Sequence, residues 1–465
     1  MEVESPVGPV SPALMDDDGK PKRTGTVWSA SAYIITAVVA VGVLSLAWAV
    51  AQLGWILGIF SIFFFASVTL FTSNLLADCY RSVTGKRNYT YMDAVKTHLG
   101  GKMYVLSGMI LYGNLSGYCI GFTITTSLSV VTILKNNCLQ KNGNKGGCYF
   151  SSNPYMMSLG AIEIILSQIP SFHKLALLSI IAAITSFGYA LIAVALSLAT
   201  VIKGNGKSTS VFGGMEHNSA DRFWNVCVAL GNIALASGFT QISIDIQDSL
   251  KSSPLEDETK VMKRANMFGL LTMTVIFLLC ACSGYAAFGS HTLGNILMSS
   301  GFLKPFWLVD LANIFIILHL VGAYQVLVQP VYRVIEILVE QRWPSSSFVT
   351  REHIVRLGKM KFSINFFRLV WRSMFVVLLT VLAMAMPFFN DMNALLGAIG
   401  FWPTVVYFPV EMFIVKKKIR KGSCRWFGLQ MLSFVCLLVS LAAACGALHG
   451  FGHALGKYKP FMYKA

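Results

Sequence analysis

The stretch that decides the fold is Ala40-Val41-Gly42-Val43-Leu44-Ser45, in the middle of a long apolar segment. A second apolar segment carries Ala236-Ser237-Gly238-Phe239-Thr240, and in both segments the glycine follows a tryptophan (Trp28 or Trp224) by fourteen residues. Fourteen residues rise about 21 Å along a helix, which reaches the middle of a bilayer or slightly beyond it. Glycine-interrupted membrane helices at matching places in two halves of a chain indicate a transporter site.

A glycine allows a helix to open, and the amide groups exposed at the opening can hold a carboxylate. The alternative is ordinary packing, because Gly and Ala are common where membrane helices touch. If the chain is built as five helices, five helices and one more, the matching positions support the site and ordinary packing about equally.

The composition places most of the chain in lipid. Of the 465 residues, 55% are hydrophobic and only 12% are charged, and the mean hydropathy is +0.63. Such a chain cannot cover its apolar surface with polar groups. About 20 apolar residues cross a bilayer, and the sequence predicts an all-α polytopic protein with about eleven such segments. They are 28–51, 54–78, 103–133, 154–170, 175–201, 223–247, 267–288, 305–338, 366–386, 393–415 and 426–448.

The basic residues predict the orientation. If the N-terminus is cytoplasmic, 27 of the 37 Lys and Arg fall on the inner side, as the positive-inside rule requires. The tail at 1–27 is polar and contains Pro and Gly, so we expect it to be disordered. The orientation places this tail in the cytoplasm and a short tail at 449–465 outside the cell. The net charge of +16 then reports orientation and contact with anionic lipid. No nucleic-acid reader motif is present, so we expect no nucleic acid partner.

Cysteine and histidine spacing bears on disulfides, metals and catalysis. Cys138 and Cys148 flank a polar loop on the predicted outer face, where an oxidising exterior would allow a disulfide. Two unpaired thiols are the alternative. No CxxC pair, His pair at zinc spacing or hydrolase motif occurs, so we expect no metal, no cofactor and no enzyme activity.

Ionisable residues inside membrane segments are costly and suggest a function. Glu163, His319 and Asp245 are the three candidates for coupling to a proton. The third segment is rich in small and polar residues, Asn114 among them, so it either lines a water-filled path or is tightly packed scaffold.

Ordered sequence motifs over nearly the whole chain after the tail resemble the plant amino acid permeases of the amino acid/auxin permease family. Among them are Gly42-Val43-Leu44-Ser45, Ser167-Gln168-Ile169-Pro170, Asp245-Ile246-Gln247-Asp248-Ser249-Leu250, Gly284-Tyr285-Ala286-Ala287-Phe288-Gly289 and Phe401-Trp402-Pro403-Thr404.

The resemblance implies a proton-coupled amino acid symporter of the plasma membrane with a LeuT-like fold. An eleven-helix domain at 28–448 would comprise inverted repeats at 28–201 and 223–415 and an extra helix at 426–448. The substrate would lie at the two broken helices. The expected substrate contacts are Ala40, Val41, Gly42, Val43, Ser45, Asn114, Asn232, Ser237, Gly238, Phe239, Thr240 and Tyr324.

This chain departs from the family pattern at the expected site. Val39-Ala40-Val41-Gly42 stands where the family usually reads Ile-Gly-Ser-Gly, Tyr33 where His is usual, and Ser237 where an aromatic residue is usual. Glu163 lies at a position where an uncharged residue is expected. These changes predict an altered substrate range or weak transport in an intact fold.

The rival is a non-transporting sensor or a channel on the same scaffold, although no filter-like loop or long soluble extension occurs. Oligomeric state is not predicted.

Overall fold

The fold was obtained as a computed structural model, which describes ten stretches of the chain. They are residues 16–20, 22–38, 42–141, 148–169, 176–214, 219–251, 257–298, 305–357, 360–386 and 388–457.

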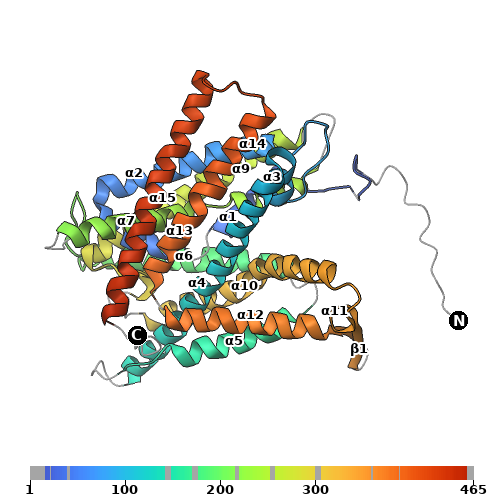
Figure 1. Cartoon of the computed structure of the whole chain (residues 1–465). Helices are drawn as coiled ribbons and strands as arrows, with labels where there is room; N and C mark the ends of the chain where they lie inside the picture. The colour runs from blue at the N-terminus through green and yellow to red at the C-terminus, as the bar shows by residue number, and fades with distance from the viewer. Residues whose placement is uncertain are drawn as a thin grey trace.

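Helices make up most of the described chain (Figure 1). In chain order they are α1 (Val27–Val38), α2 (Gly42–Asp78), α3 (Tyr91–Leu99), α4 (Gly101–Lys141), α5 (Asn153–Ser167), α6 (Ala176–Ile202), α7 (Ser219–Ser237), α8 (Ser243–Asp248), α9 (Glu258–Phe288), α10 (Phe306–Arg342), α11 (Ser347–Thr350), α12 (Phe366–Ala385), α13 (Phe389–Gly400), α14 (Phe408–Lys416) and α15 (Cys424–Lys457). Short 3₁₀ turns lie at Thr240–Ile242, Gly289–His291 and Ile296–Met298, and Phe401–Tyr407 is π-helical between α13 and α14.

Each of the eleven predicted membrane segments contains helix. Within the described residues, nine helical stretches are long and apolar enough to cross a membrane. One of them, α2, contains the end of segment 28–51 and all of 54–78, and α5 has 15 residues, fewer than the roughly 20 that a crossing needs. The membrane-helical class is confirmed, and the count of eleven crossings remains a prediction.

The turn inside α2 depends on a glycine. Gly54 has φ 80° and ψ 177°, a backbone conformation that residues with a Cβ rarely adopt. The backbone of Gly213, in the connection between α6 and α7, lies directly against it and leaves no room for a side chain. The two predicted segments therefore meet at a sharp bend that the 203–214 connection covers.

The helices pack as one bundle around the halves of the broken pair. The most extensive packing joins α2 to α9 and α7, α10 to α4 and α6, and α13 to α7 and α15. In Figure 1, α5 and α12 lie side by side, with α10 beside them.

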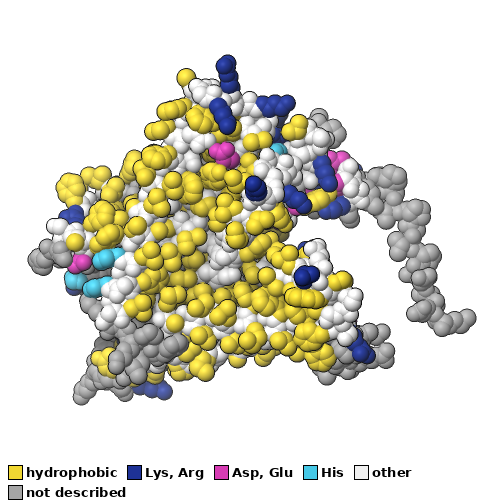
Figure 2. Space-filling view, in the orientation of Figure 1, with side chains coloured by type: hydrophobic (Ala, Val, Ile, Leu, Met, Phe, Trp, Pro, Cys, Tyr) yellow, Lys and Arg dark blue, Asp and Glu magenta, His cyan; other side chains and the backbone are white. Residues whose placement is uncertain are grey.

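Large apolar side chains are exposed over many helices, among them Phe60, Met109, Leu271, Met374 and Leu441. Figure 2 shows hydrophobic side chains over the broad middle of the face it presents, with Lys and Arg mostly toward its margins. An exposed apolar belt with charged rims is the surface expected of a protein embedded in lipid.

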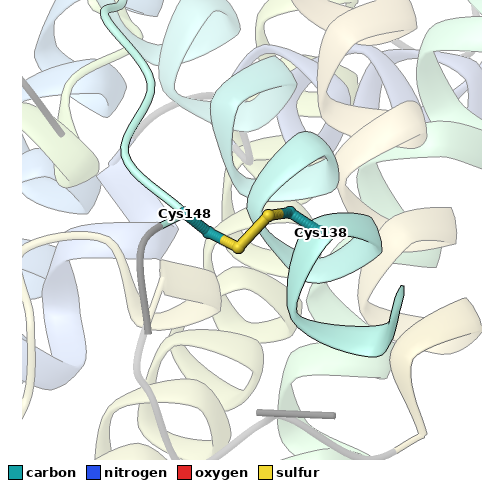
Figure 3. Close-up of a disulfide and its surroundings, with 2 residues drawn as sticks. All are labelled: Cys138 and Cys148. Atoms are coloured by element: carbon teal, nitrogen blue, oxygen red, sulfur yellow. A yellow bond between two sulfur atoms is a disulfide. The ribbon is translucent and has the colours of Figure 1, made fainter. Parts of the chain in front are cut away.

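Two features lie outside the membrane helices. A β-hairpin joins β1 (Glu352–Leu357) to β2 (Met360–Asn365) between α11 and α12, with Glu352 opposite Asn365; the sequence did not predict it. The predicted disulfide between Cys138 and Cys148 is formed and ties the end of α4 to the chain that leads into α5 (Figure 3).

Candidate functional site

The structure describes one of the two predicted helix breaks, the one that follows α7. At the other predicted break, α1 is described as far as Val38 and α2 from Gly42, and the residues between them, Ala40 and Val41 included, lie outside the described part of the chain. The second helix, α7, ends at Ser237, and the chain passes through Gly238 and Phe239 before a 3₁₀ turn leads into α8.

The start of α2 lies directly against the end of α7. A Cβ placed on Gly42 would lie 2.6 Å from both Cα and Cβ of Ala236, one residue before the end of α7. A Cβ on Gly238 would find Val405 Cγ2 at 3.5 Å as its nearest neighbour, an ordinary contact. The first glycine is therefore required for close approach of the broken helices, while the second has room for a methyl group.

Two hydroxyl groups predicted at the site are used within their own helices. Ser45 Oγ donates to the Gly42 carbonyl at 3.0 Å, and Ser237 Oγ donates to the Ile233 carbonyl at 2.9 Å. Each hydroxyl keeps its lone pairs as acceptors. These serines are thus placed at the breaks but present acceptors rather than free donors.

Thr240 contributes to a contact that sequence reasoning missed. Its Oγ1 donates to the Thr404 carbonyl at 3.0 Å, and the hydroxyl of Tyr91 donates to the same oxygen at 2.8 Å. Thr404 lies in the π-helical segment, where a carbonyl normally accepts from the amide five residues later. That residue is Pro409, which has no N–H. The Thr404 carbonyl is therefore available to accept from Thr240, just after the break that follows α7. Pro409 is the sequence feature that could have indicated this contact.

Two predicted asparagines keep an unused acceptor. Asn232 donates from Nδ2 to the carbonyls of Val228 (2.9 Å) and Asn390 (3.1 Å), and Asn114 lies 3.5 Å from the Tyr118 hydroxyl. The Oδ1 atom of each is buried and finds no hydrogen-bond partner within the described part of the chain. Such an atom can accept from an ammonium group that enters the site.

The remaining predicted contacts are buried in the bundle. Val43, Phe239 and Tyr324 are all buried, and the Tyr324 carbonyl accepts from Cys119 Sγ of α4 at 3.9 Å. The hydroxyls of Thr123 and Thr125 on α4 donate to carbonyls of their own helix, as in tightly packed scaffold.

The three proton-coupling candidates lie apart. Glu163 of α5 accepts from Gln325 of α10, whereas His319 of α10 contacts the Ala182 carbonyl of α6 through Nδ1 at 3.1 Å. Positions 319 and 325 differ by six residues, about 240° around a helix, so these contacts lie on different faces of α10. Asp245 is exposed in α8. No group of three or more metal-ligating side chains occurs among the residues that the structure places.

Part of the predicted disordered tail is ordered. Residues 16–20 and 22–26, here called the N-terminal latch, lie against the connection that follows α8. The Gly25 N–H donates to the Ser249 carbonyl at 3.0 Å, and the Lys251 N–H donates to the Gly25 carbonyl at 2.9 Å. The structure differs here from the expectation because the latch has specific partners far along the chain.

Arg23 is the centre of the latch. Its guanidinium donates to Asp248 Oδ1 at the end of α8 (2.8 Å), to Asp16 Oδ2 (3.0 Å) and to Asp18 Oδ2 (2.8 Å), and its side chain is only 8% exposed. The Tyr80 hydroxyl also donates to Asp248 Oδ1, at 2.6 Å. Hydrogen bonds from Arg23 hold the pKa of Asp18 well below its usual range. This network ties the tail to α8, the part of the second broken helix that follows the break.

A second set of charges extends the latch toward α9. Asp17 accepts from Arg87 Nε and from Arg81 NH1, both at 2.7 Å, and Arg81 also pairs with Glu258 at the start of α9. Burial opposes ionisation of Asp17, but the hydrogen bonds from the two arginines bring its pKa below the usual value. The latch therefore joins α8, α9 and the loop after α2 at one end of the bundle.

Long apolar helices packed around the break between α7 and α8 are typical of a membrane transporter with a LeuT-like fold. The solved structure of the inward-facing conformation of Mhp1 is similar over 96% of this chain and 96% of that chain, with a TM-score of 0.56 and 14% sequence identity. At that identity the similarity shows the fold.

The chain belongs to the family of transmembrane amino acid transporter proteins, whose model matches residues 23–451. Amino acid permeases 8 and 1 of Arabidopsis thaliana are each 50% identical to it; both matches cover 96% of this chain, and 95% and 93% of the relatives. Probable amino acid permease 7 of the same plant is 42% identical over 93% of this chain and 94% of its own. The predicted family, fold and non-enzymatic class are thereby confirmed.

Proposed function

We propose that this protein carries amino acids across the plasma membrane together with protons, by alternating access at the paired helix breaks. The observation that carries the proposal is the contact between Gly42 at the start of α2 and Ala236 at the end of α7, next to the two predicted breaks. Family membership supports amino acids as the substrate class.

The substrate carboxylate has a natural place at the start of α2. The first amides of a helix have no partner within it, and the helix dipole favours negative charge there. We place the break of the first helix at Ala40 and Val41, as the sequence predicts, so the amides of Gly42, Val43, Leu44 and Ser45 would take this role and Ala40 and Val41 would extend the carboxylate site. A substrate ammonium group would find acceptors at Asn232 Oδ1 and Asn114 Oδ1.

Access from the two sides would alternate by movement of the broken helices. In the orientation that the basic residues favour, the N-terminal latch lies on the cytoplasmic side and the disulfide outside. The latch holds α8 to α9 and to the loop after α2, so it must loosen when the inner side opens. Ser237 is smaller than the aromatic residue that the family usually has at this position, and this difference supports a substrate range different from that of the relatives.

A channel or a sensor on the same scaffold is the competing function, and uptake distinguishes them. Cells that express the chain should accumulate one or more of the twenty amino acids at pH 5 more than at pH 7.5, and a protonophore should abolish the accumulation. Uptake that stops at equal amino acid concentrations inside and outside would indicate a passive channel. No uptake of any amino acid would indicate a sensor. A breadth and rate equal to those of the relatives would contradict the altered substrate range.

A further inference from the structure

Glu163 is a buried carboxyl group with an incomplete set of partners. It lies in α5 with 1% of its surface exposed. Gln325 Nε2 donates to Oε2 at 2.6 Å and to the Glu163 backbone carbonyl at 3.2 Å. The other carboxyl oxygen, Oε1, is buried and has no hydrogen-bond partner in the described ranges. Within those ranges, the side-chain amide of Gln325 is therefore the one hydrogen-bond donor to this carboxyl group.

The titratable and charged groups around Glu163 do not neutralise it. They are Cys119 on α4, Tyr324 and Tyr332 on α10, and Arg372 on α12. Arg372 is the cation in this set, and its guanidinium is hydrogen-bonded to groups other than Glu163. It donates from Nε to Glu336 Oε1 at 2.8 Å and from NH1 to the Ser167 carbonyl at 2.7 Å, and it lies 5.2 Å from the centre of the Tyr332 ring.

An ionised carboxylate in this position would be expensive. Burying a charge without a counter-charge costs several kcal/mol, even after the surroundings relax. Binding a proton at Oε1 removes the charge and leaves the Gln325 bond to Oε2 in place. The group can therefore exist in two states that differ by one proton and by the strength of the contact between α5 and α10.

Polar side chains line one face of α10 from Gln325 toward its C-terminal end, and the Tyr332 hydroxyl among them is buried with no hydrogen-bond partner in the described ranges. Gln325, Gln329, Tyr332 and Glu336 follow one another at spacings of four, three and four residues, which places them on one face of the helix. Gln329 Nε2 lies 3.4 Å from Gln325 Oε1, and Glu336 at the far end meets Arg372. This polar stripe is separate from the paired helix breaks, and in the predicted orientation it ends at the cytoplasmic face.

We propose, on the basis of the proposed symport, that Glu163 is the group that carries the coupled proton and that the polar stripe on α10 is its route to the inner side. One proton adds to the Glu163 carboxylate to form the neutral acid, and the same proton leaves toward Glu336, so no other bond forms or breaks.

The test compares Glu163→Gln with a matched control, Glu411→Gln. Glu411 also accepts from a glutamine on a neighbouring helix, with Gln430 Nε2 at 2.7 Å from Oε1, but it lies at the α14–α15 contact away from the stripe. The full chain is reconstituted in vesicles, and the probe is the labelled amino acid that wild type takes up fastest. One assay measures accumulation driven by an outside pH one unit lower, and the other measures exchange with the same acid inside.

For one proton per substrate, wild type and Glu411→Gln should accumulate the probe about tenfold across one pH unit. Glu163→Gln should reach no more than equal concentrations on both sides and should still exchange at about the wild-type rate. Tenfold accumulation by Glu163→Gln would overturn the inference, as would loss of exchange in a variant that melts like wild type. Absence of accumulation in wild type would instead refute the symport itself.

A second variant keeps the inference testable if Glu163→Gln does not fold. Gln329→Leu breaks the stripe without touching Glu163 and should slow accumulation while leaving exchange unchanged. An unchanged rate of accumulation would show that the proton does not use this route.

Discussion

Adding one methyl group at Gly42 tests whether the two helix breaks must touch. In Gly42→Ala the new Cβ would lie 2.6 Å from Cα and Cβ of Ala236. Carbon atoms prefer about 3.5–4.0 Å, so α2 and α7 would have to separate by about 1 Å at the site. Because the contact includes backbone on the α7 side, a change of side-chain rotamer cannot relieve it.

Overpacking of this kind costs about 1–3 kcal/mol. A free-energy difference of that size changes an equilibrium by about 5- to 150-fold. We expect Gly42→Ala to melt at a lower temperature in detergent and to transport more slowly. Gly42→Leu should insert into the membrane and should not transport. The assays are thermal unfolding of the purified protein and initial uptake rate corrected for surface expression.

The matched control is Gly238→Ala, at the other break. Its Cβ would have Val405 Cγ2 at 3.5 Å as nearest neighbour, which requires no movement. We expect the melting temperature of this variant to stay near that of wild type. If Gly42→Ala melts and transports like Gly238→Ala, the close approach of the broken helices is not needed and the reasoning is refuted.

Three further predictions concern stability, measured by thermal unfolding. Arg23→Ala should cost about 1.5–3 kcal/mol by removing charged hydrogen bonds. Since Arg23 lowers the pKa of Asp18, that part of the stability is present above the ordinary value of about 3.9 and is lost as the pH falls below it; an equal cost at pH 7 and pH 3 would contradict this. Cys138→Ser should cost about 2–3 kcal/mol and remove any effect of a reductant; continued sensitivity to the reductant would argue against the bridge to Cys148. Tyr91→Phe should cost about 0.5–1.5 kcal/mol by removing one bond to the free π-helical carbonyl, and no change would show that the bond contributes nothing.

The sequence was sufficient for the features that depend on local pattern. Apolar length predicted the membrane helices, and Gly238 marked the break that follows α7. The disulfide followed from the spacing and surroundings of Cys138 and Cys148. In each case the cause lies within a few residues of the feature or in a simple period.

Features that depend on contacts between residues far apart in the chain could not be predicted from the sequence. Arg23 and Asp248 are 225 residues apart, and no local pattern relates them. Gln325 and Glu163 are 162 residues apart, so the sequence indicated Glu163 as a candidate but could not indicate its partner. Ser45 was expected to bind substrate through its hydroxyl, yet serine in a helix tends to donate to a carbonyl three or four residues back, and it does so here.

The most direct test of the proposed symport measures both solutes at once. The purified full chain is placed in vesicles that contain a pH-sensitive dye and have equal pH on both sides, and the best amino acid of the uptake screen is added outside. We predict that the amino acid gradient alone drives protons inward, so that the lumen acidifies as the label enters. Entry of the label with no change in luminal pH, under conditions that dissipate the membrane potential, would contradict proton-coupled symport.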